Sequence, residues 1–203
     1  MELKKKREIV FLQILYLYII PTMLFYFDVI PDKFRFVTLL CIALTLYGIV
    51  RKHHWTSSEF GITKNFMKDI APYFIFTVSG VLFLVWLAKI TPHSPMLEWW
   101  DNKKFILLFI PFSILQEIIF RGVLMRLLRK AFTSPVFIIT INAALFSFMH
   151  VIYTHSIFVL PMTFIGGIGF AWMYYKYPNL ILISASHTVF NFVGMILGFF
   201  VLR

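Results

Sequence analysis

The sequence predicts an all-α membrane protein, a polytopic helix bundle with about seven transmembrane helices. The chain has 203 residues, of which 60% are hydrophobic and only 14% are charged. Soluble domains average about 45–50% apolar and 25% charged residues, so this composition is typical of a chain embedded in a bilayer. Because no polar tract is long enough for a second domain, we expect residues 1–203 to form a single integral membrane domain.

Seven apolar runs have a length that suits a transmembrane helix, which needs roughly 17–25 residues. In chain order, the expected spans are 9–27, 34–50, 70–90, 105–126, 135–153, 157–175 and 180–202. The first run is too long for a signal peptide and no small-residue cleavage site follows it, so we expect a retained span. Turn and loop signals separate the runs at Pro31, in the polar stretch 51–69, at Pro92 and Pro95, at 133–135 and at Pro178.

The loops between these runs carry most of the basic residues. With the N-terminus inside, twelve Lys and Arg residues lie on the cytoplasmic side and six on the other. Since cytoplasmic loops are enriched in Lys and Arg, we expect a multi-pass cell-membrane protein with a cytoplasmic N-terminus. The net charge of +10 is therefore explained without nucleic acid binding. The small size of the chain and its richness in Lys, Ile and Phe fit a bacterial source, so we expect a bacterial plasma membrane.

Two smaller features complete the fold prediction. Residues 55–69 would form either a short interfacial helix or a solvated loop. Cys41 is the one cysteine of the chain, so an internal disulfide is excluded, and its apolar surroundings predict a core position.

Three short polar patterns lie inside apolar runs, where a charged side chain at the membrane centre costs roughly 2.5–3.5 kcal/mol. They are Gln116-Glu117…Arg121, Phe146…His150 and His187…Asn191. In the first and third patterns two polar residues are four positions apart, and such residues share one face of a helix. At about 1.5 Å per residue the three patterns reach similar depths, so the helices can bring them into one cavity.

These residue types suggest hydrolytic chemistry. Two histidines and an oxygen ligand, from His150, His187 and Asn191, match a zinc site that leaves one position for water. Glu117 could then take a proton from that water, and Arg121 could hold the carboxylate or stabilise developing negative charge. The alternative is that these groups only pair with one another and lock the helices together.

The three motifs, in this order, resemble the CPBP family, which comprises CAAX prenyl endopeptidases and bacteriocin-processing and immunity-type (Abi) relatives. The family pattern is Glu-Glu-x-x-x-Arg, Phe-x-x-x-His and His-x-x-x-Asn or Asp, and the similarity covers about residues 105–195. It implies a membrane bundle with a conical cavity, in which peptide bonds of a membrane-associated protein or peptide are cleaved. It also implies that His150, His187 and Asn191 hold a metal or water, with Glu117 as the second Glu and Arg121 as its support.

Gln116 departs from this pattern, because it replaces the Glu usually assigned as the water-activating base. An amide cannot take a proton at neutral pH. Adjacent helical residues point about 100° apart, so Glu117 replaces that base only if the helix is rotated. Otherwise the chain is a non-catalytic scaffold or regulator of a membrane protein partner. A third hypothesis is a small transporter that uses Glu117 and the histidines as a proton relay.

Overall fold

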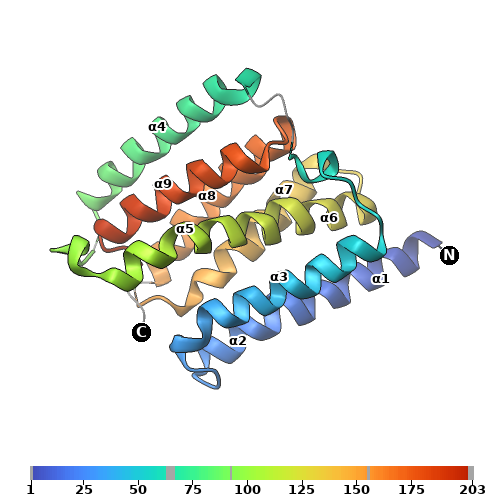
Figure 1. Cartoon of the computed structure of the whole chain (residues 1–203), viewed down its shortest axis with the longest axis horizontal. Coiled ribbons are helices and arrows are strands. Elements are labelled where there is room, and N and C mark those ends of the chain that lie inside the picture. Colours follow the sequence, from blue (N-terminus) through green and yellow to red (C-terminus); the bar gives the residue numbers. More distant parts are fainter. Residues whose placement is uncertain (1, 63–66, 92, 155, 201–203) are drawn as a thin grey trace.

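The apolar runs form long helices that pack side by side, as Figure 1 shows. The structure is a computed structural model that describes residues 2–62, 67–91, 93–154 and 156–200, apart from the side chains of residues 2, 3, 104 and 105. It is 82% helical, and no strand occurs in these ranges. The predicted all-α membrane bundle is therefore confirmed.

Six helical stretches are long and apolar enough to cross a membrane, counting only the described part of the chain. Two of them contain a π-helical segment between α-helices: α1 (Glu2–Ile14), η1 (Leu15–Ile19) and α2 (Ile20–Tyr26), then α5 (Lys103–Glu117), η6 (Ile118–Leu124) and α6 (Met125–Ala131). The other four are α3 (Arg35–Lys52), α4 (Ile70–Ala88), α7 (Pro135–Phe148) with its 3₁₀ extension η7 (Met149–Ile152), and α8 (Ser156–Lys176). A seventh apolar helix, α9 (Leu180–Ile196), is shorter.

The end of α9 differs from the prediction of a span over 180–202. The helix stops at Ile196 because Gly198 adopts a left-handed conformation with φ of 81°. The Gly198 N–H bonds to the Met195 carbonyl and the Phe199 N–H to the Gly194 carbonyl, at 3.0 Å each, which is a Schellman cap. Residues 201 and 202 of the predicted span lie outside the described part of the chain. Hydropathy alone predicted a longer helix because the residues after the cap are also apolar.

Two further expectations are decided by the structure. Within 55–69 the described residues form two 3₁₀ turns, η3 (Ser58–Phe60) and η4 (Met67–Asp69), while residues 63–66 lie outside the described part. The loop alternative is therefore the one observed for the described residues. The core position expected for Cys41 is wrong, because its side chain is exposed on α3. In a membrane helix an apolar environment can be lipid as well as protein, and the pattern of residues does not distinguish the two.

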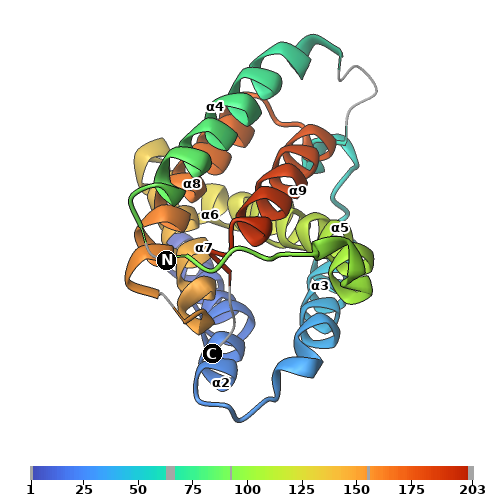
Figure 2. The ribbon, with the colours of Figure 1, turned by 90° about the vertical axis from the view of Figure 1, so that its left-hand side faces the viewer.

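The helix that carries the first polar motif is at the centre of the bundle. Helices α1 and α3 pack against one side of the α5–η6–α6 stretch, and α7 and α9 pack against it as well. Figure 2 shows α4 at one edge of the bundle and α2 with α3 at the other. In an apolar 18-residue segment of the α5–α6 stretch, 44% of the residues are buried inside the protein, whereas the corresponding share for the α4 stretch is 11%. The two charged residues of the polar motif on this helix, Glu117 and Arg121, are buried and are therefore surrounded by protein rather than by lipid.

The two π-helical segments are in contact with each other. The hydroxyl of Tyr18, in η1, donates a hydrogen bond of 2.9 Å to the backbone carbonyl of Ile119, in η6. The Nδ2 of Asn142, on α7, donates a bond of 2.8 Å to the carbonyl of the next residue, Phe120. Short π-helical turns are rare and occur frequently at functional sites. Here two side chains from neighbouring helices satisfy carbonyls of the widened turn, so they hold its geometry.

We expect Asn142→Leu to destabilise the folded chain by about 1–3 kcal/mol, because it leaves the buried Phe120 carbonyl without this donor. The measurement is thermal unfolding of the purified protein in detergent. The matched control is Thr45→Val, since the Thr45 hydroxyl bonds to the Cys41 carbonyl of its own helix on an exposed face. Equal melting temperatures for the two variants would contradict a special role for Asn142.

Candidate active site

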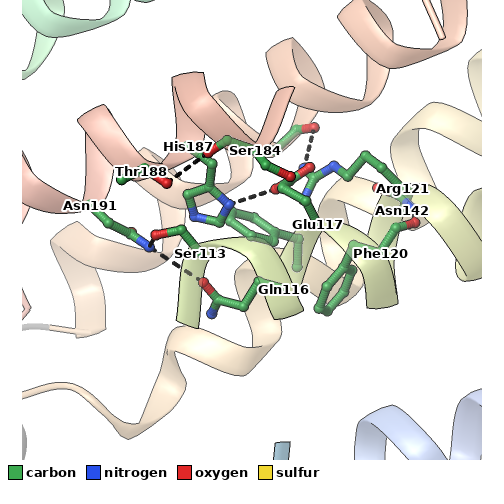
Figure 3. A network of polar contacts seen from close by, with 12 residues as sticks. Ser113, Gln116, Glu117, Phe120, Arg121, Asn142, Ser184, His187, Thr188 and Asn191 are labelled. Carbon is green, nitrogen blue, oxygen red and sulfur yellow. Dashed lines mark hydrogen bonds and ion pairs between the residues drawn. The ribbon is translucent and has the colours of Figure 1, made fainter. Parts of the chain in front are cut away.

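Glu117, the last residue of α5 before the π-helical segment, joins the first and third polar motifs. One oxygen of its carboxylate, Oε1, accepts a hydrogen bond of 3.0 Å from the Arg121 guanidinium. The same oxygen lies 2.5 Å from Nδ1 of His187 on α9 (Figure 3). All three side chains are buried, and Glu117 and Arg121 have no exposed surface. The three residues form a closed charge cluster, defined here as Glu117, Arg121 and His187.

Arg121 is held by aromatic rings as well as by its ion pair. The guanidinium carbon lies 4.5 Å from the ring centroid of Phe146 and 5.1 Å from that of Phe170. One guanidinium nitrogen also lies 3.4 Å from the backbone carbonyl of Gly167 on α8. Desolvated cation–π contacts of this kind are worth about 2 kcal/mol. A cation at this depth is therefore stabilised from three helices at once.

The proton positions on the two histidines follow from their partners. Arginine keeps its proton in proteins, so the Glu117 group that pairs with it is an anionic acceptor, and Nδ1 of His187 must donate. His150, in η7, has its Nδ1 2.8 Å from the carbonyl of Phe146, which can also only accept. In the neutral form each ring then has its acceptor lone pair on Nε2. Both imidazoles are fixed in orientation and available as a base or ligand through that second nitrogen.

The two amide residues form a separate pair. Nδ2 of Asn191 lies 2.9 Å from the Ser113 hydroxyl and 3.4 Å from Oε1 of Gln116 (Figure 3). Ser113 in turn donates to the Phe109 carbonyl of its own helix. The Gln116–Asn191 pair and the charge cluster lie on the same two helices, α5 and α9. No pattern in the sequence had singled out Ser113.

His150 is connected to the charge cluster through the ring of Phe146. This ring lies 4.9 Å from the His150 ring and 5.4 Å from the His187 ring, measured between centroids. The four-residue spacing of Phe146 and His150 thus places both rings on one side of their helix, next to His187. The three motifs lie close together in space. The cavity described next, however, does not hold all three of them as the sequence predicted, because Gln116 and His150 line it and the third motif does not.

A narrow cavity reaches part of this constellation. Gln116 and His150 line it, together with Arg35, Tyr153 and apolar side chains of α2, α3 and α5. It contains about 570 Å³ of space between atoms, including its open mouth. The charge cluster does not face this cavity, since none of its three residues lines it. The sequence offered one signal for Arg35, a cation at a helix N-terminus, where the helix dipole disfavours it.

The three predicted metal ligands provide two imidazoles and one amide. Among the described residues, no group of three or more His, Cys, Asp or Glu side chains is placed to hold a metal ion. His150 and His187 offer two imidazole nitrogens whose other nitrogens are anchored, as is usual for metal ligands. The third predicted ligand, Asn191, is an amide, which is not a usual zinc ligand. The donor set thus falls short of a three-ligand zinc centre, and zinc stays a prediction from the sequence.

Comparison with known proteins supports the resemblance seen in the motifs. No curated protein and no solved structure matches the chain. Residues 98–193 match the family model described as Rce1-like, type II CAAX prenyl endopeptidase Rce1-like. This range contains all six predicted site residues, and therefore the whole charge cluster. Over residues 98–193, slightly less than half of its length, the chain is therefore similar to the Rce1-like CAAX endopeptidase family, which agrees with the CPBP resemblance of its motifs.

Proposed function

We propose that the protein is an intramembrane endopeptidase that hydrolyses a peptide bond of a membrane-associated protein or peptide. The observation that carries this proposal is the joint placement of His150 and Gln116 on the wall of one cavity. The cavity gives water and a peptide a common position beside an imidazole with a free acceptor nitrogen. The Rce1-like match supports the same class of reaction.

In this proposal His150 is the general base. Its Nε2 takes a proton from water while the water oxygen attacks the carbonyl carbon, and the proton then passes to the leaving amine. The amide N–H groups of Gln116, which lines the cavity, can donate to the carbonyl oxygen as negative charge develops there, while Asn191 donates to Oε1 of Gln116 and orients its amide. In the charge cluster, the Glu117 carboxylate fixes the proton of His187 on Nδ1 and so fixes the orientation of that ring.

The sequence pattern assigned water activation to Glu117, and this assignment is a rival within the same proposal. Its Oε1 already accepts bonds from Arg121 and His187, and its Oε2 is buried without a hydrogen-bond partner. That free oxygen would have to reach the substrate water for Glu117 to act as the base. The metal predicted from the sequence, with His150, His187 and Asn191 as ligands, would lower the pKa of a bound water, but the donor set observed here falls short of such a site.

The test is cleavage of a fluorogenic farnesylated CAAX peptide by the purified protein in nanodiscs. We expect His150→Gln to lower the rate by about 10²–10⁴-fold, the usual contribution of a general base. Gln116→Glu should raise the rate, because it adds a carboxylate beside the same water. Unchanged cleavage in His150→Gln, at unchanged thermal stability, would refute this role and leave Glu117 as the base. Metal analysis of the wild type and of His150→Ala checks the predicted zinc in the same preparations.

A non-catalytic scaffold is the second candidate, and Gln116 favours it. A wild type that cleaves nothing, beside a Gln116→Glu variant that cleaves, would identify the protein as a member that has lost its base. It would then act by binding a membrane protein partner. Activity in the wild type that depends on His150 would exclude this reading.

We also propose that the chain lies in a bacterial plasma membrane with a cytoplasmic N-terminus, which tagging of the first loop can test.

A further inference from the structure

Two cations of α6 lie over one indole ring at the end of this helix. The Arg126 guanidinium carbon is 4.7 Å from the ring centroid of Trp55, and the Lys130 ammonium nitrogen is 4.5 Å from it. Because the two cations are four positions apart, they share one face of the helix, where like charges repel. Glu59 pairs with Arg126, but none of the ion pairs identified among the described residues includes Lys130. The surroundings of the indole therefore hold an excess of positive charge.

Two N–H groups at the same place have no acceptor. Among the described residues, Nε1 of Trp55 and Nε of Arg126 are buried nitrogens that make no hydrogen bond. Both nitrogens can only donate, and buried donors in proteins are nearly always paired. The site is nevertheless open to a ligand, since Lys130 is exposed and the Arg126 side chain is 26% exposed. This set of donors suits an anion with several acceptor oxygens, such as a phosphate.

The segment that carries the indole is fixed against the helix of the charge cluster. The ring of Phe60 lies 5.7 Å from that of Trp55 and packs on Gly122 in η6, where an added Cβ would lie 3.1 Å from it. The carbonyl of Gly61 accepts a hydrogen bond of 2.9 Å from the N–H of Leu180, at the start of α9. The indole therefore has a defined place beside α6, so a ligand that binds there has little of the chain to order.

The position of these donors along the helix favours a lipid as the ligand. The apolar span of the α5–α6 stretch ends at Ala131, one position after Lys130, so the ammonium group lies where the headgroups begin. Indole rings are enriched at the same level. Two more cations lie at this end, because Arg7 donates a bond of 3.0 Å to the Ala131 carbonyl and Arg129 one of 3.2 Å to the Tyr175 carbonyl. Basic pockets between membrane helices attract anionic headgroups.

We propose that Trp55, Arg126 and Lys130 bind the phosphate of an anionic phospholipid such as phosphatidylglycerol. The phosphate oxygens accept hydrogen bonds from the indole N–H, the guanidinium and the ammonium group. Glu59 competes with the lipid, since its carboxylate already pairs with the same guanidinium. Phosphatidylcholine binds less well, because its choline group adds a cation beside the two of the site. The inference goes beyond the endopeptidase and does not depend on cleavage.

Binding of short-chain lipids to the purified protein in a neutral detergent tests this. The probes are dioctanoyl phosphatidylglycerol, dioctanoyl phosphatidylcholine and soluble glycerol phosphate, and native mass spectrometry measures the bound fraction at each concentration. We expect the wild type to bind the anionic lipid about 10-fold more tightly than the choline lipid. Lys130→Gln should weaken its binding about 5-fold, the value of one cation near a headgroup. Trp55→Phe keeps a ring and removes the N–H, so it should weaken binding about 10-fold. Glu59→Gln should strengthen it.

The matched control is Arg129→Gln. It removes the same charge one position from Lys130, where the guanidinium lies 4.1 Å from the ring of Tyr175 instead of over the indole. The affinity for the anionic lipid should stay nearly unchanged. Equal weakening by Arg129→Gln and Lys130→Gln would overturn the inference, because the lipid would then respond only to the total charge of this end. Equal binding of the two lipids by the wild type would also overturn it. So would glycerol phosphate that binds as tightly as the anionic lipid, since the site would then take a soluble phosphate.

Discussion

Replacing Arg121 by methionine is expected to destabilise the folded protein by about 3–5 kcal/mol, because it leaves a buried charge without its partner. Glu117 has no exposed surface, and without Arg121 its carboxylate keeps only the hydrogen bond with Nδ1 of His187. Methionine keeps much of the volume of the side chain, so the effect isolates the charge and the guanidinium hydrogen bonds. The measurement is unfolding of the purified protein in detergent, followed by circular dichroism against denaturant.

A double variant separates charge from packing. Glu117→Gln with Arg121→Met removes both charges, and replacing a whole buried pair is often nearly neutral. We expect the double variant to be more stable than Arg121→Met alone, with a coupling energy of about 2 kcal/mol. Additive losses would contradict this. They would show that the contacts of the guanidinium with Phe146 and Phe170 dominate its contribution.

Gly198→Ala is expected to cost about 3 kcal/mol, which is the second large effect. A Cβ at this position would lie 1.8 Å from the carbonyl oxygen of Ser94, and the φ of 81° adds strain for any L side chain. The segment at Ser94 would have to move away from the end of α9. It would lose the bonds from Ser94 N–H to the Gly198 carbonyl, at 3.3 Å, and from Met96 N–H to the Ile196 carbonyl, at 2.9 Å.

This substitution should also lower any cleavage activity. The turn at Gly198 brings the ring of Phe200 to 5.7 Å from the His150 ring. The matched control is Gly166→Ala in α8, where an added Cβ meets no atom within 4 Å. Alanine in a helix interior is favoured over glycine by roughly 0.5–1 kcal/mol, so this variant should be slightly more stable. A melting temperature of Gly198→Ala close to that of Gly166→Ala would refute the steric prediction.

Much of the fold could be predicted from the sequence because lipid imposes a simple rule on length and hydropathy. The run predicted at 70–90 is α4, which spans Ile70–Ala88, and the prediction for 157–175 is equally close to α8. Errors arose where local geometry overrides hydropathy. The turn at Gly198 ends α9 inside an apolar run, and Cys41 faces outward although its neighbours are apolar.

The convergence of the polar motifs was also predictable, because helical spacing places Glu117 and Arg121 on one face and similar depths bring His187 to them. The separation of the site into a buried charge cluster and a cavity wall could not be predicted from the sequence. Whether Glu117 or Gln116 faces the cavity depends on helix rotation, and the π-helical turn after Glu117 has no pattern that hydropathy could reveal. The positions of Tyr18 and Arg35 depend on contacts between residues more than 100 positions apart in the chain.

The two π-helical segments that face each other have a consequence for how this protein can change over evolution. The family match begins at residue 98, yet Tyr18 of the first helix holds the turn that carries Arg121. A chain made of the matched region alone would therefore leave the Ile119 carbonyl without its hydrogen-bond donor and would lack one wall of the cavity. Conversely, mutations in the first two helices can reshape that wall while the three polar motifs stay intact. The N-terminal helices thus provide a route to a changed cavity around an unchanged set of polar motifs.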